Sequence, residues 1–540
     1  MSSHQNVFPA AGQADWQTLV EKVLEGASSQ SLARRDEDDL DIQALYPVGE
    51  DDGAMAPLGP LAQARLVHGW DVAQPIMVSI GADRDSLFAV NQMILDAVES
   101  GATSLILFID DASANHFDRL FDQVILPAID VQFCAGADTC NVAKKFADYA
   151  RRQPNAILNI NVGHDPLSFG CSAIENGVAL LDSDLTVAGL FHFDGWDWHN
   201  RGLTAAQEIG LVLSGLAALL RRGQDRDIET IVDKCNVSMA LPADSFLGLG
   251  KVRAMRLGWA GLCKAFGIDN YPLFITGITS LRMMSLLDQD VNMLRNATAF
   301  LGGAIGGADR MAGFSHDFLS QETEAGRRLT RTTQLMMIEE SGLACSLDPA
   351  AGAPFLEQRS DDLSVAAWAV MQQIEEAGGL DAALQSGLIA SMASKANARR
   401  HAALSSGETQ LVGVTLQPSP DPSAAPTGAS RFAGLSRPAS IVESFRHTKS
   451  ARRILILSAD ESDKNEERDL QRWLATGGLT AVTLKNHSSE DIATAAPDIV
   501  ILCTDVADIV LPDKVQILTA KAILSSKDQL GMLANVIGDA

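Results

Sequence analysis

Three side chains with catalytic potential follow one another within residues 187–204. This stretch begins as an apolar, aromatic run of strand character and breaks at Gly195, where two tryptophans follow at an expected turn. Asp194, Asp197 and His199 lie at or just beyond that break. In a barrel of alternating strands and helices, residues just past a strand's end lie at the open face, where catalytic groups are found. Carboxylates and an imidazole there could act as general acids and bases.

Two further pairs follow expected strands. His164 and Asp165 come after the run 156–161 and could also perform acid–base chemistry at a barrel rim. Asp110 and Asp111 follow an earlier run and could be catalytic carboxylates. The simpler interpretations are a structural or vestigial role for the first pair and a solvated loop for the second.

The common metal and phosphate motifs have little support. The sequence contains no His-x-x-x-His or Glu-x-x-His pair and no Gly-x-Ser-x-Gly elbow. Gly248-Leu-Gly250-Lys251 lacks the run that wraps a phosphate, and Val252 stands where a magnesium-binding hydroxyl would be, so we predict a helix start. The glycine-rich run 301–309 could bind an anion through its N–H groups, but close packing is at least as plausible. We predict no metal site.

Composition excludes several functional classes. The net charge of −26 over 540 residues disfavours nucleic acid as a partner. Seven dispersed cysteines favour buried thiols in a reducing compartment rather than disulfides. We expect no targeting segment and no membrane span, because no apolar run is long enough, and we therefore expect a cytoplasmic protein.

Strand and helix patterns alternate through the first half of the chain. β-rich runs are expected at 76–80, 104–109, 131–135, 156–161, 187–193, 236–241 and 272–276, with an eighth strand in the run 301–309. Helical periodicity is expected at 87–99, 140–151, 203–221, 246–266 and 288–300. About eight such units predict an α/β fold with a (β/α)8 TIM barrel, although an open doubly wound sheet stays possible.

The remaining chain divides by composition. We expect an N-terminal arm at 1–60, the barrel at 61–310, a helical extension at 311–415, a Pro/Ser/Ala-rich linker at 416–450 and a small α/β domain at 451–540. The arm carries an amphipathic helix capped by Asp15 and ended by Gly26. Its apolar face consists of Trp16, Leu19, Val20, Val23 and Leu24. This face must pack on the main body or on another subunit.

Four segments resemble methylmalonyl-CoA mutases. They are RTTQLMMIEESGLACSLDPAAG and its continuation (331–379), PLFITGITSLRMMSLLDQDVNMLRNATAFLGGAIGGA (272–308), GWDV (69–72) and HNRGLTAAQEIG (199–210). The resemblance covers most of the chain. It implies a barrel that binds acyl-CoA, a linker, and a C-terminal flavodoxin-like domain that carries adenosylcobalamin.

The chain departs from the family pattern at the cobalt ligand. After the first strand of the cobalamin domain the family places Asp-x-His-x-x-Gly, and that histidine coordinates cobalt. Here Asp460 is present, but the histidine position holds Ser462 and the glycine position holds Asn465. A neutral hydroxyl is a poor cobalt ligand where imidazole is needed.

The barrel departs as well. Aligned with the family pattern, the catalytic histidine becomes Asp197, and two small serines become His192 and Asp194, which would narrow the bore through which CoA passes. An expected tyrosine is Pro75, and an expected glutamine falls at Ile305. The resemblance therefore implies no catalytic, cofactor-binding or metal-ligating residue in this chain.

These losses are similar to those of the small, non-catalytic subunits of heterodimeric members of the family. Such a subunit binds no cofactor, while its catalytic large-subunit partner holds adenosylcobalamin and interconverts methylmalonyl-CoA and succinyl-CoA. Two alternatives remain open. One is a homodimeric acyl-CoA mutase that binds cobalamin without a histidine ligand. The other is a cofactor-free barrel enzyme using Asp197, His199 or His164.

Overall fold

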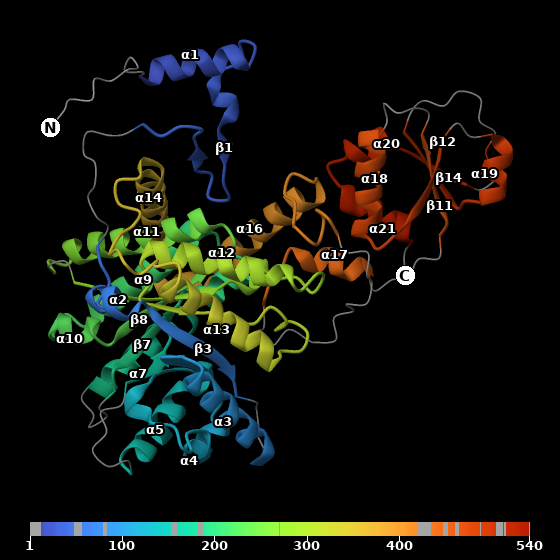
Figure 1. The fold of residues 1–540 in the computed structure, drawn as a ribbon. Coiled ribbons are helices and arrows are strands. Elements are labelled where there is room, and N and C mark those ends of the chain that lie inside the picture. Colours follow the sequence, from blue (N-terminus) through green and yellow to red (C-terminus); the bar gives the residue numbers. More distant parts are fainter. Residues whose placement is uncertain are drawn as a thin grey trace, which may run out of the picture.

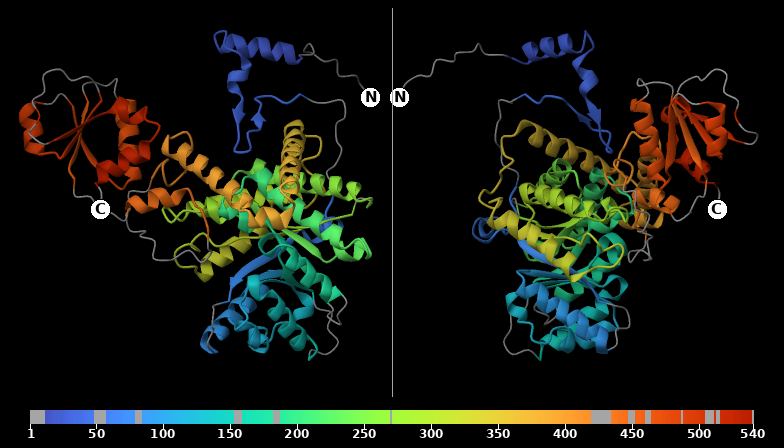
Figure 2. Two further views of the ribbon diagram at one scale, coloured as in Figure 1. Left: turned by 180° about the vertical axis from the view of Figure 1, so that it is seen from behind. Right: turned by 45° about the vertical axis from the view of Figure 1, so that its right-hand side comes forward.

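The structure is a computed structural model containing two separate parallel sheets. It describes residues 12–47, 57–78, 84–152, 159–181, 187–268, 271–418, 434–446, 452–458, 464–485, 488–503, 511 and 515–538. Within these ranges one sheet closes into a barrel and the other is a small open sheet near the C-terminus. Figures 1 and 2 show the small sheet to one side of the barrel, beyond helices α16 (Leu388–Ser405) and α17 (Ala439–Arg446), and the N-terminal arm reaching away from the main body.

Eight parallel strands form the barrel in the order β10-β3-β4-β5-β6-β7-β8-β9. They are β3 (Asp71–Met77), β4 (Ser104–Phe108), β5 (Asp130–Cys134), β6 (Ile160–His164), β7 (Gly189–Asp194), β8 (Cys235–Leu241), β9 (Phe274–Thr279) and β10 (Arg310–Ala312). The expected TIM barrel is confirmed.

Helices cover the barrel from outside. The longer ones are α3 (Arg84–Glu99), α5 (Thr139–Ala150), α7 (Cys171–Leu181), α9 (Ala205–Arg222), α11 (Ser245–Ala265) and α12 (Val291–Gly306). Short ones are α2 (Ala62–His68), α4 (Phe117–Leu120), α6 (Pro166–Phe169), α8 (Gly195–Arg201) and α10 (Ile228–Val232). Helix α9 is buried on almost every side, because the barrel lies against one face and α14 (Pro354–Glu376) against another.

Four local expectations were wrong. Helix α1 (Gln13–Val23) has Gly12 as its N-cap, and Asp15 lies inside the first turn, where its Oδ2 accepts the N–H of Gly12 at 2.8 Å. Strand β6 runs over Ile160–His164, so His164 ends the strand instead of following it; half of the expected run 156–161 lies outside the described residues. The tryptophans after Gly195 belong to helix α8, not to a turn. The glycine-rich run 301–309 mostly completes helix α12, where Gly302 and Gly306 let α11 approach closely, and the eighth strand follows it.

The N-terminal arm consists of helix α1 (Gln13–Val23) and a hairpin of β1 (Arg34–Arg35) and β2 (Asp41–Ile42). The hairpin tip is acidic, and each of its four acidic residues contacts a different group of the main body. Asp36 pairs with Arg359, Glu37 with Arg400 at 2.7 Å, and Asp39 with Arg399 at 2.8 Å, while Asp38 accepts the N–H of Ala206 at the start of α9. Charge pairing thus fixes the base of the arm.

Helices and the small sheet complete the chain. The extension contains α13 (Glu324–Glu339), α14, α15 (Leu380–Gln385) and α16 (Leu388–Ser405), followed by α17 (Ala439–Arg446). The small sheet has the order β12-β11-β13-β14, from β11 (Ile454–Ser458), β12 (Ala481–Lys485), β13 (Ile499–Leu502) and β14 (Gln516–Thr519). Helices α18 (Lys464–Thr476), α19 (Ser489–Ala495), α20 (Ala520–Leu524) and α21 (Gln529–Ile537) pack around it. Its core continues into Leu404 and Val414, as expected for a domain too small to stand alone.

Candidate functional site

Helix α8 places the three candidate residues of 187–204. Asp194 ends β7 and caps the helix, because its Oδ1 accepts the N–H of Asp197 at 3.1 Å and the hydroxyl of Ser238 at 2.6 Å. The turn between strand and helix is tight: a Cβ at Gly195 would lie 2.9 Å from the carbonyl oxygen of Ser238. Only glycine therefore allows α8 to begin directly at the strand end.

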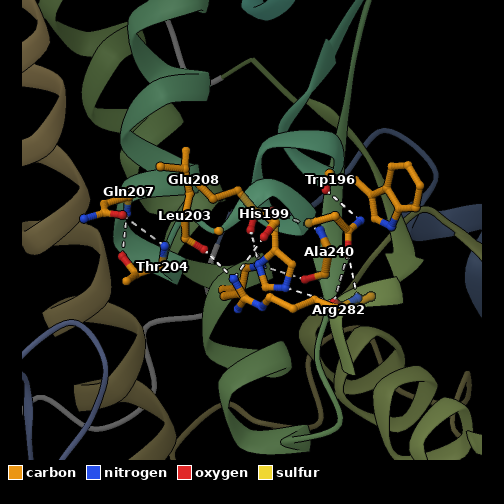
Figure 3. A network of polar contacts seen from close by, with 12 residues as sticks. Trp196, His199, Leu203, Thr204, Gln207, Glu208, Ala240 and Arg282 are labelled. Carbon is orange, nitrogen blue, oxygen red and sulfur yellow. Dashed lines mark hydrogen bonds and ion pairs between the residues drawn. The ribbon is translucent and has the colours of Figure 1, made fainter. Parts of the chain in front are cut away.

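His199 lies in a sealed polar network (Figure 3). Its side chain is 2 % exposed, with Nδ1 2.9 Å from Glu208 Oε2 and Nε2 3.0 Å from Ser280 Oγ. The same Glu208 oxygen lies 2.6 Å from Lys251 Nζ. Burial, followed by the nearby charges of Arg282 and Lys251, holds the pKa of His199 well below its ordinary value. The imidazole is therefore neutral and has no path to a substrate.

Glu208 and Lys251 connect this network to the backbone of strand β8. Glu208 Oε1 accepts the N–H of Ala240 at 2.9 Å, and Lys251 Nζ donates to the carbonyl of the same residue. Burial raises the pKa of the Glu208 carboxyl and lowers that of Lys251, and their mutual contact opposes both shifts. The lysine of the Gly248–Lys251 motif thus serves the core inside α11, as the helix interpretation expects, and binds no phosphate.

His164 and Asp197 do not join His199 in a common site. His164 is 2 % exposed, burial lowers its pKa to about 4, and its Nε2 has no hydrogen-bond partner in the described part of the chain. Asp197 faces a cleft at the barrel mouth that neither histidine lines, and it pairs with Arg201 at 2.7 Å. The acid–base constellation of the cofactor-free alternative is therefore not assembled.

The mouth cleft has a volume of about 350 Å³ and gathers three carboxylates. They are Asp165, Asp194 and Asp197, from the ends of β6 and β7 and the start of α8. Burial and the charge of Asp194 raise the pKa of Asp165 to about 7 and that of Asp197 to about 6. Like charges in a partly desolvated cleft disfavour further negative charge.

Side chains fill the barrel interior from base to middle. Near the base, Arg310 of β10 reaches Asp130 of β5 at 3.0 Å. In the middle, Asn236 of β8 donates to Gln132 of β5 at 2.6 Å and contacts His192 of β7 at 2.5 Å. Strands β10 and β5, and β8 and β5, are not neighbours in the sheet, so these contacts cross the bore.

The upper bore is filled by aromatic rings. Trp196 stacks on Phe314 with ring centroids 5.5 Å apart, and Phe108 lies 6.0 Å from Phe314. This cluster packs on the inward residues of five strands, Ala73, Ile106, Ala240, Ile278 and Ala312. The end of the linker covers part of it: Leu435 joins the cluster, and Ser436 donates its N–H to Asn200 of α8 at 2.9 Å.

The other predicted positions lie apart from the cleft. Asp111 pairs with Lys145 at 2.6 Å, and Asp110 accepts the N–H of Ser113, as expected of loop residues. Pro75 lies in β3, and Ile305 lies on α12, outside the barrel wall. Within the ranges that the structure describes, no group of three His, Cys, Asp or Glu side chains could hold a metal ion.

The sequence interpretation missed the groups that cross the bore. Gln132, Asn236 and Arg310 lie on buried strands at positions whose neighbours point to the outer helices. Strand periodicity places every second residue on the inner face, so polar residues at those positions were the available signal.

No helix among the described residues is long and apolar enough to cross a membrane.

Comparisons with known proteins agree with this fold. The sequence profile of methylmalonyl-CoA mutase matches residues 191–452. A methylmalonyl-CoA mutase small subunit of Streptomyces virginiae is 30% identical over 467 residues, which cover 78% of this chain and 74% of that protein. A small subunit of Propionibacterium freudenreichii subsp. shermanii is 26% identical, covering 76% and 69%. A large subunit of Streptomyces virginiae is 29% identical over 41% of this chain and 31% of its own length. The chain belongs to the methylmalonyl-CoA mutase family.

Proposed function

We propose that this chain is the non-catalytic small subunit of a heterodimeric, adenosylcobalamin-dependent methylmalonyl-CoA mutase of the cytoplasm. The catalytic large subunit carries out the isomerisation of methylmalonyl-CoA and succinyl-CoA, and this chain stabilises it. Selection for the subunit interface preserves the fold, while the residues at the family's active-site positions are free to change. The names of the relatives above support the assignment to the small subunits.

The filled barrel carries the proposal. A CoA thioester that reaches the mouth through the bore needs a continuous passage. Here Arg310 and Asp130 occupy the base, His192 and Asn236 the middle, and the Trp196 cluster the top. Opening that passage would break buried ion pairs and hydrogen bonds and would leave the aromatic rings without packing partners.

The residues present do not fit adenosylcobalamin. Asp460 and Ser462, which stand at the expected cobalt-ligand motif, lie outside the described residues, and Asn465 is part of helix α18. The segment between β11 and α18 has no histidine in its sequence, so no imidazole follows this strand to bind cobalt. The chemistry of this donor set argues against a cobalamin site, and we assign the cofactor to the large subunit.

The N-terminal arm offers a surface for that partner. Helix α1 has no buried residue, and Leu19 and Val23 on its apolar face are 65 % and 81 % exposed. The hairpin holds the arm to α9, α14 and α16 through its four acidic residues, so the helix is presented outward. An obligate pair buries more than about 2,000 Å², and a fixed arm extends the contact area.

Co-expression with the large subunit of the same organism tests the proposal. We expect the two chains to copurify and the complex to show mutase activity, whereas this chain alone shows neither activity nor a bound-cobalamin spectrum. Asp197→Asn in this chain should leave kcat of the complex unchanged. Leu19→Glu combined with Val23→Glu should reduce copurification, and Thr18→Glu on the opposite side of α1 is the matched control.

Two results would overturn it. A bound-cobalamin spectrum of this chain alone would favour the homodimeric mutase. Loss of kcat on Asp197→Asn, with copurification intact, would place this residue in the chemistry.

A further inference from the structure

Four arginine side chains gather beside the junction of helices α8 and α9. Arg282 follows strand β9, Arg359 lies on α14, and Arg399 and Arg400 lie near the end of α16. The side chains of Arg359, Arg400 and Arg282 are 5 %, 7 % and 11 % exposed. We call these four residues the arginine socket. In a chain of net charge −26 the socket is a local concentration of positive charge.

Main-chain carbonyls hold two of these arginines in place. Arg282 Nη1 donates to the carbonyls of His199 and Leu203, both at 2.9 Å. Arg400 Nη1 donates to the carbonyl of Gly202 at 2.7 Å. These carbonyls lie at the end of α8, so the two guanidinium groups stay close together whether or not the arm is present. Burial, followed by the nearby charge of Arg400, lowers the pKa of Arg282 to about 10. Two such charges need a counter-charge beside them.

The chain fills the socket with the acidic tip of its own hairpin, residues 36–39, which points from α1 toward the main body (Figure 2). Glu37 accepts Nε and Nη2 of Arg400 at 2.8 and 2.7 Å and lies 4.0 Å from Arg282. Asp39 forms a second forked contact, at 2.8 and 3.2 Å, with the arginine that precedes Arg400. The other two carboxylates reach α14 and the first turn of α9. Forked contacts of this kind are specific for carboxylates.

Apart from this ionic contact, the arm makes few contacts with the main body. Ser29 is the one buried residue among the described residues 12–47, and helix α1 buries none. Leu40 packs against the edge of the barrel's core, and the ring of Tyr46 lies 5.2 Å from that of Phe355. Because little apolar surface is buried, ionic attraction decides whether the arm is docked. Salt weakens this attraction, since the screening length falls from about 10 Å at 0.1 M to about 3 Å at 1 M.

We propose that the arginine socket is a receptor for acidic peptide segments and that the arm docks in it reversibly through residues 36–39. Three residues of chain span up to about 10 Å, so a run of carboxylates reaches several arginines at once. A single phosphate ion cannot do so, and a basic or apolar peptide would leave the guanidinium groups without counter-charges. When the arm leaves, the preformed socket is open to an acidic segment of another chain. The contact lies within one polypeptide and does not depend on the proposed large subunit.

Hydrogen exchange of the purified full-length chain, followed by mass spectrometry, measures docking of the arm. The N–H of Ala206 has Asp38 as its acceptor and reports docking from the barrel side. Raising NaCl from about 50 mM to about 1 M should speed exchange about tenfold in peptides that cover residues 34–42 and 204–207, because several ion pairs are screened together. Peptides of the barrel strands should not change.

Two hairpin variants separate the socket contact from general charge. Glu37→Gln removes the carboxylate with the most contacts, and we expect about tenfold faster exchange in the same peptides at low salt. Asp41→Asn removes one charge from the same hairpin, but its partner is Arg35 and not the socket, so exchange should change less than about twofold. If Glu37→Gln does not fold, the salt series on the unsubstituted chain decides.

A labelled peptide with the sequence of residues 32–43 tests the receptor directly. The full chain carrying Asp36→Asn, Glu37→Gln and Asp39→Asn should bind it saturably, as measured by fluorescence anisotropy. The unsubstituted chain, whose own tip competes at high effective concentration, should bind it at least about tenfold more weakly. So should the variant with a peptide of the same composition whose acidic residues are dispersed.

Five results would each overturn the proposal. They are salt-independent exchange of the hairpin, an equal effect of Asp41→Asn, no saturable peptide binding, equal binding of the dispersed peptide, and displacement of the peptide by millimolar phosphate.

Discussion

Helix α8 separates two polar regions of opposite character. His199 joins a network that is closed to solvent, with Glu208 and Lys251 both 0 % exposed, whereas Asp197, two residues earlier, faces the mouth cleft. Residues at positions i and i+2 of an α-helix point about 200° apart around its axis. Asp197 and His199 therefore cannot face the same site. Because Asp197 and His199 are close in sequence, their positions indicated one shared site. The structure places them in two separate regions.

The two regions also treat charge differently. Inside, each charged group has an opposite partner and hydrogen bonds, which is the condition for burying charge. At the cleft, three carboxylates lie together, and burial and the charge of Asp194 raise the pKa values of Asp165 and Asp197. The first arrangement is typical of a structural network, whereas carboxylates with raised pKa values in a cleft are typical of functional sites.

Among the changes considered, Lys251→Met should lower the free energy of unfolding the most. It leaves the Glu208 carboxylate buried without its cation, and we expect a loss of about 3–5 kcal/mol in the free energy of unfolding. Urea denaturation measures it. The double variant Glu208→Gln/Lys251→Met should recover much of the loss; if Lys251→Met alone costs less than about 1 kcal/mol, the network is not a closed charge pair.

Asp165→Asn should act in the opposite direction and depend on pH. Folding raises the pKa of Asp165 from 3.8 to about 7, so the native state binds the extra proton and loses stability as the pH rises through this window. At pH 8 the variant should be more stable than the unsubstituted protein by about 1–2 kcal/mol, which is less than the full shift implies because water enters the cleft. The difference should vanish near pH 4. A constant difference in thermal unfolding from pH 4 to pH 8 would contradict this.

Arg201→Ala should have the smallest effect on stability. Its ion pair with Asp197 is partly exposed, so we expect a loss below about 1 kcal/mol. Because Arg201 lowers the pKa of Asp197, its removal should move that pKa further above about 6. NMR titration of the side-chain carboxyl measures the shift, and a fall in the pKa would show that Arg201 does not face Asp197 in solution.

The local sequence pattern predicted the architecture but not the boundaries of every helix and strand. The alternation of apolar runs and helical periodicity predicted the closed barrel and the second sheet, because each element must bury one face. The glycine-rich run 301–309 failed as a strand: its small residues serve a close helix contact between α12 and α11, which single-sequence pattern does not distinguish from strand packing.

The sequence by itself placed His192, Asp194 and Asp197 around the end of one strand, and the family resemblance predicted that Asp197 stands where a catalytic histidine is expected. The tertiary structure decided what those groups do. Whether Asn236 meets Gln132 across the bore, or His199 turns inward to Glu208, depends on barrel closure and helix rotation. Both contacts join residues more than eight positions apart, which no local pattern encodes. Burial then sets their charge states, because the cost of desolvation is fixed only when the whole fold surrounds them.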